Sequence, residues 1–414
     1  MNSDSPSSNA CCCVHPIAVS HIVLPMALHV KALNNDTSFL LSFIPSICPI
    51  DQKFPETFPG AFTILVDPVA PTDQLDELPL ARQSSIVSLT DVPEPDAILI
   101  SQALPDHCHE DSLCQLSPHV QSMIVGEPTA IKTIKRWRHF DYGNISSLRR
   151  YRRGRSDTLF RVEIPPPSPL GTPGEVTIAL LAQKSGGVHN ALGITYREPS
   201  SILSRSRAMT SSPPMSRASS SKPPTSTASF ITSTTEYAGC EPTIAVVYSP
   251  HGVPYDTVEP WVSGHLAPES ALPPVAFIHS TTAVNAPWYS GGNIISGCPG
   301  GLEIAQRLLP TAWIAAHDID LTTSTGAVKN LCRVEYNIMD VESELWEGLM
   351  DRGIRRKPQI IRLGVGETLR VDEYSANKIA EEATQDIKKQ EIHGHTTDGA
   401  TIDGQNVVAI EEPA

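Results

Sequence analysis

The sequence lacks an excess of positive charge, and it lacks the pattern of a secretory signal or a membrane span. Its net charge is −14, which argues against a general nucleic-acid binder, because such proteins present clustered lysine and arginine. The first residues, 1–9, carry no basic start, and the apolar stretch 17–30 is interrupted by His21, Pro25 and His29. We therefore expect no signal peptide, no stable membrane insertion and no nucleic-acid partner.

The cysteines do not form a disulfide framework. There are 9 of them, an odd number, and Cys11, Cys12 and Cys13 are adjacent while the others are scattered. This pattern predicts a reducing, cytoplasmic location. The triplet offers a site for palmitate or for metal, but a tail without a function of its own is the favoured interpretation.

Composition predicts one large ordered domain, 26–373, with three segments that do not fold stably. Residues 1–25 form a loose tail, and residues 374–414 form an acidic tail that is partly helical or disordered. Residues 199–236 are rich in serine, threonine and proline, and cannot bury enough apolar surface to offset the entropy of ordering. They are expected to be a disordered insertion within the domain.

Short apolar segments alternate with helical patterns along the domain, as in an α/β protein. Strands are predicted at 36–43, 60–67, 97–101, 175–181, 192–196, 243–248, 274–278, 312–316 and, as the last one, 359–363. Helices are predicted at 110–116, 130–140, 299–309 and 341–349. Five arginines between 149 and 155 are interpreted as a solvated loop, with a phosphate- or phospholipid-binding patch as the alternative.

A damaged metal motif follows the apolar run 97–100. An intact His-x-His-x-Asp-His at such a strand end is typical of a two-metal hydrolase. Here Gln102 and Leu104 stand at the first two histidine positions, while Asp106 and His107 remain. Whether the chain is an enzyme depends on what this half-motif still binds.

Other predicted strands also end at residues with metal or acid–base chemistry. They are Asp106 and His107, His251, His279, and finally His317 with Asp318. Because ligands of α/β sheets gather beyond the carboxyl ends of strands, these side chains are candidates for one shared site, although a single histidine after a strand is more often structural. Imidazole and carboxylate together suit Zn, Fe or Mn. The sequence shows neither a Gly-x-Ser-x-Gly nucleophile elbow nor a Walker loop.

Taken together, several motifs resemble the metallo-β-lactamase superfamily, and most closely an uncharacterised fungal subgroup related to its lactonase-like branch. The resemblance runs from about Asn34 to Arg370, without the insertion. The motifs are Asp36-Thr-Ser-Phe-Leu-Leu, Phe62-Thr-Ile-Leu-Val-Asp67-Pro68, Ile100-Ser-Gln, Asp106-His107-Cys108, Val188-His189-Asn190, Tyr248-Ser-Pro-His251-Gly252, Pro287-Trp288 and Trp313-Ile-Ala-Ala-His317-Asp318.

The resemblance implies an αββα sandwich of two mixed sheets with helices outside. In its metal scheme Gln102, Leu104 and His189 match the ligands of the first metal. Asp106, His107 and His317 match ligands of the second metal. The bridging aspartate would lie near His251, where the sequence has no aspartate and His251 is the available substitute.

Two hypotheses follow. In the first, Asp106, His107, His317 and His251 hold one zinc-like ion (Zn, Fe or Mn), while Asp318 or His279 relays protons. Such a protein hydrolyses an ester, lactone, amide or phosphoester bond of a small molecule. In the second, the chain is an inactive binding or scaffolding relative, because Leu104 cannot bind a cation and the bridging aspartate is missing.

Overall fold

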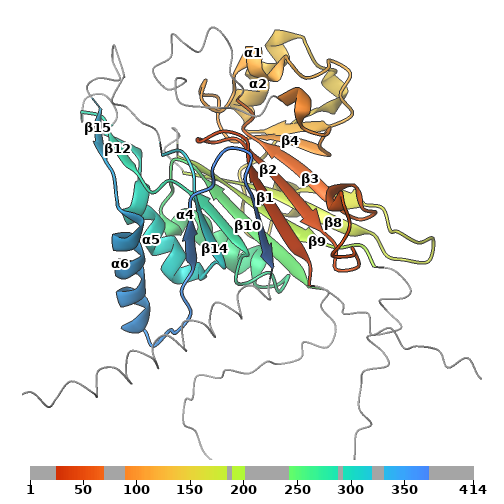
Figure 1. Cartoon of the computed structure of the whole chain (residues 1–414). Coiled ribbons are helices and arrows are strands. Elements are labelled where there is room, and N and C mark those ends of the chain that lie inside the picture. The colour runs from red at the N-terminus through yellow and green to blue at the C-terminus, as the bar shows by residue number, and fades with distance from the viewer. Residues whose placement is uncertain are drawn as a thin grey trace, which may run out of the picture.

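The computed structural model describes residues 25–69, 89–183, 189–200, 242–287, 292–318 and 331–372. Two seven-stranded sheets face each other and carry the helices on their outer sides (Figure 1). The predicted tails and the predicted Ser/Thr/Pro insertion lie almost wholly outside these ranges. The described ranges also contain no helix with the length and apolar character needed to span a bilayer.

The first sheet is antiparallel at one edge and parallel at the other. Its strands pair in the order β17 (Thr368–Asp372), β1 (Ala27–Ala32), β2 (Phe39–Ile44), β3 (Phe62–Val66), β4 (Ala97–Ile100), β5 (Met123–Gly126) and β6 (Ile145–Ser147). The pairs from β3 to β6 are parallel. The loops after β3 and β4 therefore leave the sheet at the same end.

The second sheet repeats this mixed design. Its order is β16 (Gln359–Ile361), β14 (Ala312–Ala315), β11 (Ala276–His279), β10 (Thr243–Ser249), β9 (Asn190–Arg197), β8 (Gly174–Ala182) and β7 (Phe160–Ile164). The pairs from β10 to β16 are parallel. A small sheet of β13 (Asn293–Ile295), β12 (Ala283–Asn285) and β15 (Cys332–Val334) lies beside it.

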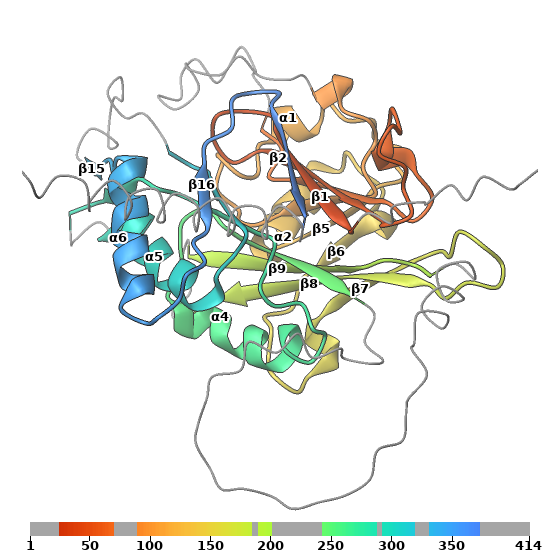
Figure 2. The same ribbon diagram turned by 60° about the horizontal axis from the view of Figure 1, so that its bottom comes forward.

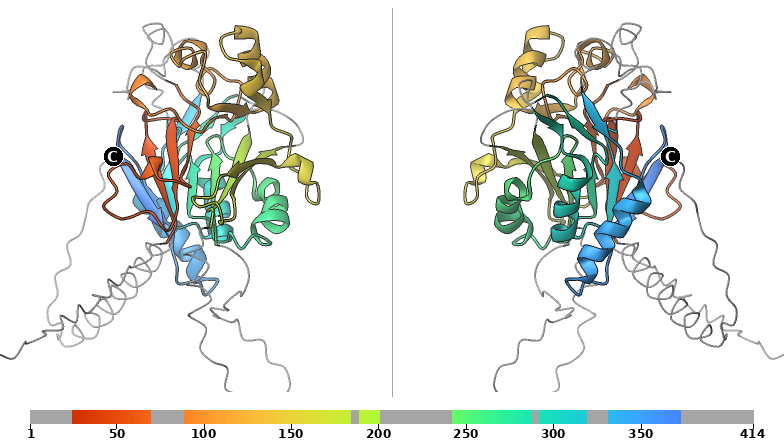
Figure 3. Two further views of the ribbon diagram at one scale, coloured as in Figure 1. Left: turned by 90° about the vertical axis from the view of Figure 1, so that its right-hand side faces the viewer. Right: turned by 90° about the vertical axis from the view of Figure 1, so that its left-hand side faces the viewer.

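The helices form the two outer layers (Figures 2 and 3). Against the first sheet pack α1 (Glu110–Leu113) and α2 (Pro128–Trp137). Against the second pack α4 (Tyr255–Trp261), the π-helical turn η6 (Val262–Leu266), α5 (Gly297–Leu308) and α6 (Ile338–Met350). Short 3-10 turns are η1 (Pro55–Thr57), η3 (Leu89–Asp91), η4 (Tyr142–Asn144) and η5 (Ser156–Thr158).

Three apolar clusters correspond to the three interfaces between these layers. The largest joins inward-facing residues of both sheets, such as Leu41 and Ile64 from the first and Ile178 and Val246 from the second. The other two join each sheet to its own helices. This arrangement confirms the predicted αββα sandwich. Strands buried on both faces explain the continuous apolar runs in the sequence.

One prediction about the sheets is wrong. The strand at 359–363 is not the last one, because β17 follows it and pairs antiparallel with β1 at the edge of the first sheet. In β17 only the last two residues are buried. Its segment therefore lacks the apolar run that marks the central strands.

Candidate metal centre

Four side chains from both sheets converge at one end of the sandwich. Asp106 and His107 lie in the turn after β4, His251 follows β10, and His317 follows β14. One ligand atom from each lies within 4.8 Å of the others. The parallel pairing of these strands with their neighbours brings their carboxyl ends, and therefore these side chains, to the same rim.

His107 is oriented by Asp67, which directly follows β3. The Nδ1 of His107 lies 2.8 Å from Oδ2 of Asp67, and both side chains are fully buried. The same carboxylate accepts hydrogen bonds from the backbone N–H of Ser101 at 2.7 Å, from the Ser101 hydroxyl at 2.5 Å and from the Tyr248 hydroxyl at 2.7 Å. The Asp67 carboxylate is therefore the acceptor that fixes the Nδ1 side of the His107 ring.

The other two histidines of the cluster also have Nδ1 bonded to an oxygen atom outside the cluster. Nδ1 of His317 lies 2.6 Å from Oδ1 of Asp36, and Nδ1 of His251 donates to the carbonyl oxygen of Ile294 at 3.2 Å. With each Nδ1 bonded away from the cluster, the three Nε2 atoms are left facing one another. An outer-shell carboxylate or carbonyl that fixes the histidine tautomer is the usual support of a metal-binding imidazole.

The inward-facing nitrogens lie close together, and the contact between them needs a proton on one of the two rings or a cation between them. Nε2 of His107 and Nε2 of His251 are 2.9 Å apart. The carboxylate of Asp106 completes the group, 3.7 Å from Nε2 of His107 and 3.6 Å from Nε2 of His317. Lone pairs at this separation repel unless a proton or a cation lies between them.

Burial and neighbouring charges drive the pKa values of two of these histidines apart. Burial alone would lower the pKa of His107, but Asp106, Asp67 and Asp36 together raise it to about 9. Burial, together with His317 and His107, holds the pKa of His251 well below its usual value. These shifts favour a protonated His107 beside a neutral His251, and a cation bound between the two rings would replace that proton.

Two of the residues around the cluster have unusual backbone geometry. Asp67 has φ of 42° and His317 has φ of 58°, a region that non-glycine residues rarely adopt. Backbone hydrogen bonds fix both positions, from Asp67 N–H to Leu99 O and from His317 N–H to Asp36 O, each at 2.9 Å. Such conformations cost about 1–3 kcal/mol and concentrate at functional sites.

The donor set fits a cation. It combines three imidazole nitrogens and one carboxylate, the ligands that zinc and related transition metals prefer. The three rings are almost fully buried, whereas 18% of the Asp106 side chain is exposed. Asp106 is therefore the member of the cluster that is in contact with solvent.

His189 and His279 lie outside this group, and both ring nitrogens of each contact backbone carbonyl oxygens. His189 contacts Gly252 O at 2.9 Å and Asn293 O at 3.0 Å. His279 contacts Ser249 O at 2.7 Å and Gly297 O at 3.0 Å. In these positions the two rings tie loops together instead of facing the four-residue cluster.

Asp318 points toward the turn after β11. Its carboxylate accepts from the backbone N–H of Thr281 and of Thr282, both at 2.8 Å, and from the Thr281 hydroxyl at 2.6 Å, and it pairs with Arg362 at 2.9 Å. Burial opposes ionisation, but these hydrogen bonds and the Arg362 charge outweigh it and lower the pKa of Asp318. Asp318 thereby fixes the chain next to His317.

The residues at the two lost histidine positions differ from each other in their surroundings. Gln102 is 2% exposed, and among the described residues its side-chain oxygen and nitrogen have no hydrogen-bond partner. Leu104 contributes its carbonyl oxygen, which accepts from the N–H groups of His107 at 3.0 Å and Cys108 at 2.7 Å. Leu104 thus shapes the turn that presents Asp106 and His107.

The roles of Asp36 and Asp67 were not predicted from the sequence, although both residues stand in the quoted motifs. A carboxylate directly after an apolar strand, followed by Pro68, is the signal that points to Asp67. Asp36 gives no comparable signal, because its partner His317 is 281 residues away.

Comparison with known proteins places part of the chain in a family. The family model described as the beta-lactamase superfamily domain matches residues 56–157, which include Asp67, Asp106 and His107. This segment is similar to that superfamily domain. The fungal subgroup and the lactonase-like branch stay predictions. No curated protein matches the chain.

Two solved structures align with most of the chain. One is an isothiocyanate hydrolase from Delia radicum gut bacteria, with 14% identity, a TM-score of 0.40, and coverage of 84% of this chain and 99% of that one. The other is the metallo-beta-lactamase fold protein YhfI from Bacillus subtilis, with 10% identity, a TM-score of 0.40, and coverage of 83% and 99%.

Proposed function

We propose that this protein is a hydrolase that depends on a single divalent metal, held by Asp106, His107, His251 and His317. The observation that carries the proposal is the 2.9 Å separation between Nε2 of His107 and Nε2 of His251, while the Nδ1 atom of each ring bonds outward. Three lone pairs and a carboxylate directed at one point form a cation site. Zinc, iron and manganese all suit these ligands.

A metal at this position supplies a Lewis acid and makes water a nucleophile near neutral pH. The protein contributes the rest of the chemistry. Asp106 is the partly exposed member, so its carboxylate is placed to accept a proton from the attacking water and to pass it to the leaving group. Asp67, Asp36 and the Ile294 carbonyl keep the three rings in the tautomer that the site needs.

Asp318 and His279 are better suited to positioning than to proton relay. The lowered pKa of Asp318 keeps it ionised, and four of its neighbours donate to it. His279 has both nitrogens on carbonyl oxygens and is fully buried. Both residues support the loops that carry His251 and His317.

The proposed substrate is a small molecule with an ester, lactone, amide or phosphoester bond. The proposal keeps a reducing, cytoplasmic location. The test is hydrolysis of a panel of such substrates after loading with Zn, Mn or Fe. We expect activity that chelation removes and that His317→Ala abolishes, whereas the exposed His119→Ala serves as a matched histidine control.

A second candidate function is a binding or scaffolding role without catalysis. Leu104 and Gln102 favour it, because they replace two of the three first-metal ligands of the resembled family. This candidate predicts that Asp106→Ala and His107→Ala leave function and thermal stability nearly unchanged. Activity lost in both variants, with their folds intact by circular dichroism, would eliminate it.

A further inference from the structure

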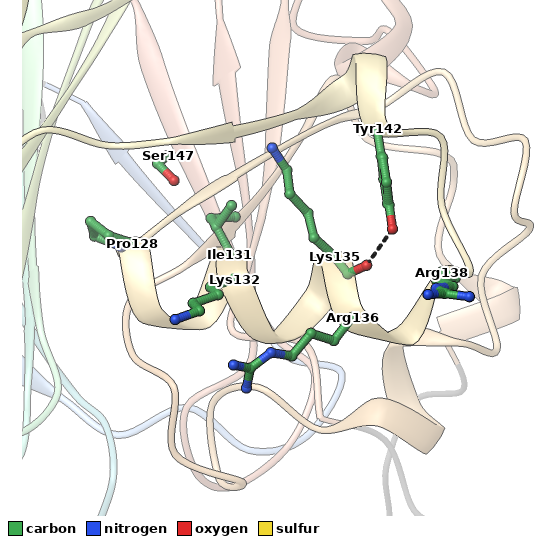
Figure 4. A pocket seen from close by; sticks show the side chains of 8 residues that line it. All are labelled: Pro128, Ile131, Lys132, Lys135, Arg136, Arg138, Tyr142 and Ser147. Atoms are coloured by element: carbon green, nitrogen blue, oxygen red, sulfur yellow. Dashed lines mark hydrogen bonds between the residues drawn. The ribbon is translucent and has the colours of Figure 1, made fainter.

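A basic pocket lies on the outer side of the first sheet, away from the residues of the metal cluster. It has a volume of about 500 Å³ and is formed by α2, the turn η4 and β6. Its lining includes four cationic side chains, Lys132, Lys135, Arg136 and Arg138, but no carboxylate (Figure 4). Such a concentration stands out in a chain whose net charge is −14.

The helix is built so that these cations face outward. Ala130, Ile131 and Ile134 are buried against the first sheet, which leaves the polar face of α2 to line the pocket. Figure 4 shows the Lys135 side chain standing between Ile131 and Tyr142. The Tyr142 hydroxyl donates to the backbone oxygen of Lys135 at 2.7 Å and so ties η4 to the helix.

Within the described part of the chain, none of the four cations has a carboxylate partner. The two nearest acidic residues in sequence are engaged elsewhere. Glu127 caps the start of the helix by accepting from Thr129 N–H and Ala130 N–H, and Asp141 accepts from Gly143 N–H. The pocket therefore has uncompensated positive charge.

Lys135 and Arg136 also offset the partial negative charge at the end of the helix, which is an ordinary role for cations there. That role does not account for Lys132, one turn earlier, or for Lys135 being half-buried without an anion. A cationic side chain removed from water gains from an opposite charge beside it. An anionic ligand supplies that charge.

We propose that this pocket binds a small ligand that carries a diphosphate or triphosphate group. Phosphate oxygens match several lysine and arginine donors at once, and the hydroxyl of Ser147, which also lines the pocket, adds a further donor. The volume suits a small molecule, because ligand pockets are typically about 300–1,000 Å³. The site is independent of the proposed hydrolytic centre.

The test is calorimetric titration of inorganic pyrophosphate into the full-length protein at low ionic strength, and into Lys132→Gln/Lys135→Gln. Glutamine keeps helix propensity and side-chain length while it removes the charge. Lys31→Gln/Lys53→Gln is the matched control, since it also removes one half-buried and one exposed lysine, but outside the pocket. We expect the affinity for pyrophosphate to fall about tenfold or more in Lys132→Gln/Lys135→Gln but not in the control variant. In the unsubstituted protein the affinity should fall as salt is added.

Two further measurements test whether the phosphate group binds elsewhere on the protein or comes from a membrane lipid. In His317→Ala the pyrophosphate affinity should persist, because that variant disables only the metal cluster. Vesicles that contain a phosphorylated lipid test whether the anion comes from a membrane surface instead. The proposal is overturned by the absence of pyrophosphate binding, by equal loss in the two double variants, by loss in His317→Ala alone, or by binding to vesicles without binding to pyrophosphate.

Discussion

Replacing Asp67 with asparagine should weaken metal binding about 10–100-fold, while the metal-free protein still folds. The Asp67 carboxylate receives hydrogen bonds from the Ser101 N–H, the Ser101 hydroxyl, the Tyr248 hydroxyl and Nδ1 of His107. The asparagine oxygen can still accept from the Ser101 N–H. The two hydroxyl groups can rotate to accept from the new amide, because a hydroxyl both donates and accepts.

His107 has no such freedom. Facing an amide donor, its Nδ1 gives up the proton, which moves to Nε2 and removes the inward lone pair. Loss of such an outer-shell partner typically costs about 10–100-fold in metal affinity, or about 1.4–2.7 kcal/mol. The metal-free protein loses only the charged character of these hydrogen bonds, which we expect to lower its unfolding free energy by about 1–3 kcal/mol.

The assay is competition for Zn²⁺ against a chromophoric chelator, paired with denaturant unfolding of the metal-free protein. Nitrogen-15 NMR of the His107 ring reports the tautomer directly. Asp96→Asn is the matched control, because Asp96 accepts from Thr63 N–H at 2.7 Å and the Thr63 hydroxyl at 2.9 Å, but contacts no histidine. Unchanged affinity and an unchanged His107 tautomer in Asp67→Asn would refute the reasoning.

Two further predictions concern the layer between the second sheet and its helices. Gly193→Ala should lower the unfolding free energy, measured by urea denaturation, by about 1–3 kcal/mol. The new Cβ would lie 2.6 Å from the Trp261 ring, and such overpacking is destabilising. A variant as stable as the wild type would contradict this packing. In the folded protein at pH 8, Cys298 should resist iodoacetamide while the exposed Cys332 reacts. The thiolate is the reactive form, and burial raises the pKa of Cys298 to about 12. Peptide mass spectrometry measures both thiols, and equal labelling would contradict the second prediction.

The central strands were predictable from the sequence because they are buried on both faces. The segments 60–67, 97–101 and 243–248 correspond to β3, β4 and β10, where every residue is buried. The strands at one side of the first sheet were harder to predict. The edge strand β17 has only two buried residues, its neighbour β1 includes two half-buried ones, and the two strands pair from opposite ends of the domain.

The residues of the candidate metal centre were also only partly predictable from the sequence. A motif and strand-end positions indicated Asp106, His107, His251 and His317, but strand-end positions also indicated His279 and Asp318, and the family resemblance indicated His189. Which of these side chains lie close together depends on how each ring is oriented at the end of the sandwich. His279 lies within β11 and turns its ring toward the carbonyl oxygen of Ser249 on the neighbouring strand, whereas His317 follows β14 and is turned inward by Asp36. These side-chain contacts depend on three-dimensional packing and leave no pattern in the sequence.

Metal content of the purified protein tests the central claim most directly. Elemental analysis should find about one equivalent of Zn, Fe or Mn per chain, and His317→Ala should lose it while His119→Ala retains it. Less than about half an equivalent after loading with metal, or a content that His317→Ala leaves unchanged, would contradict a metal site built from these residues.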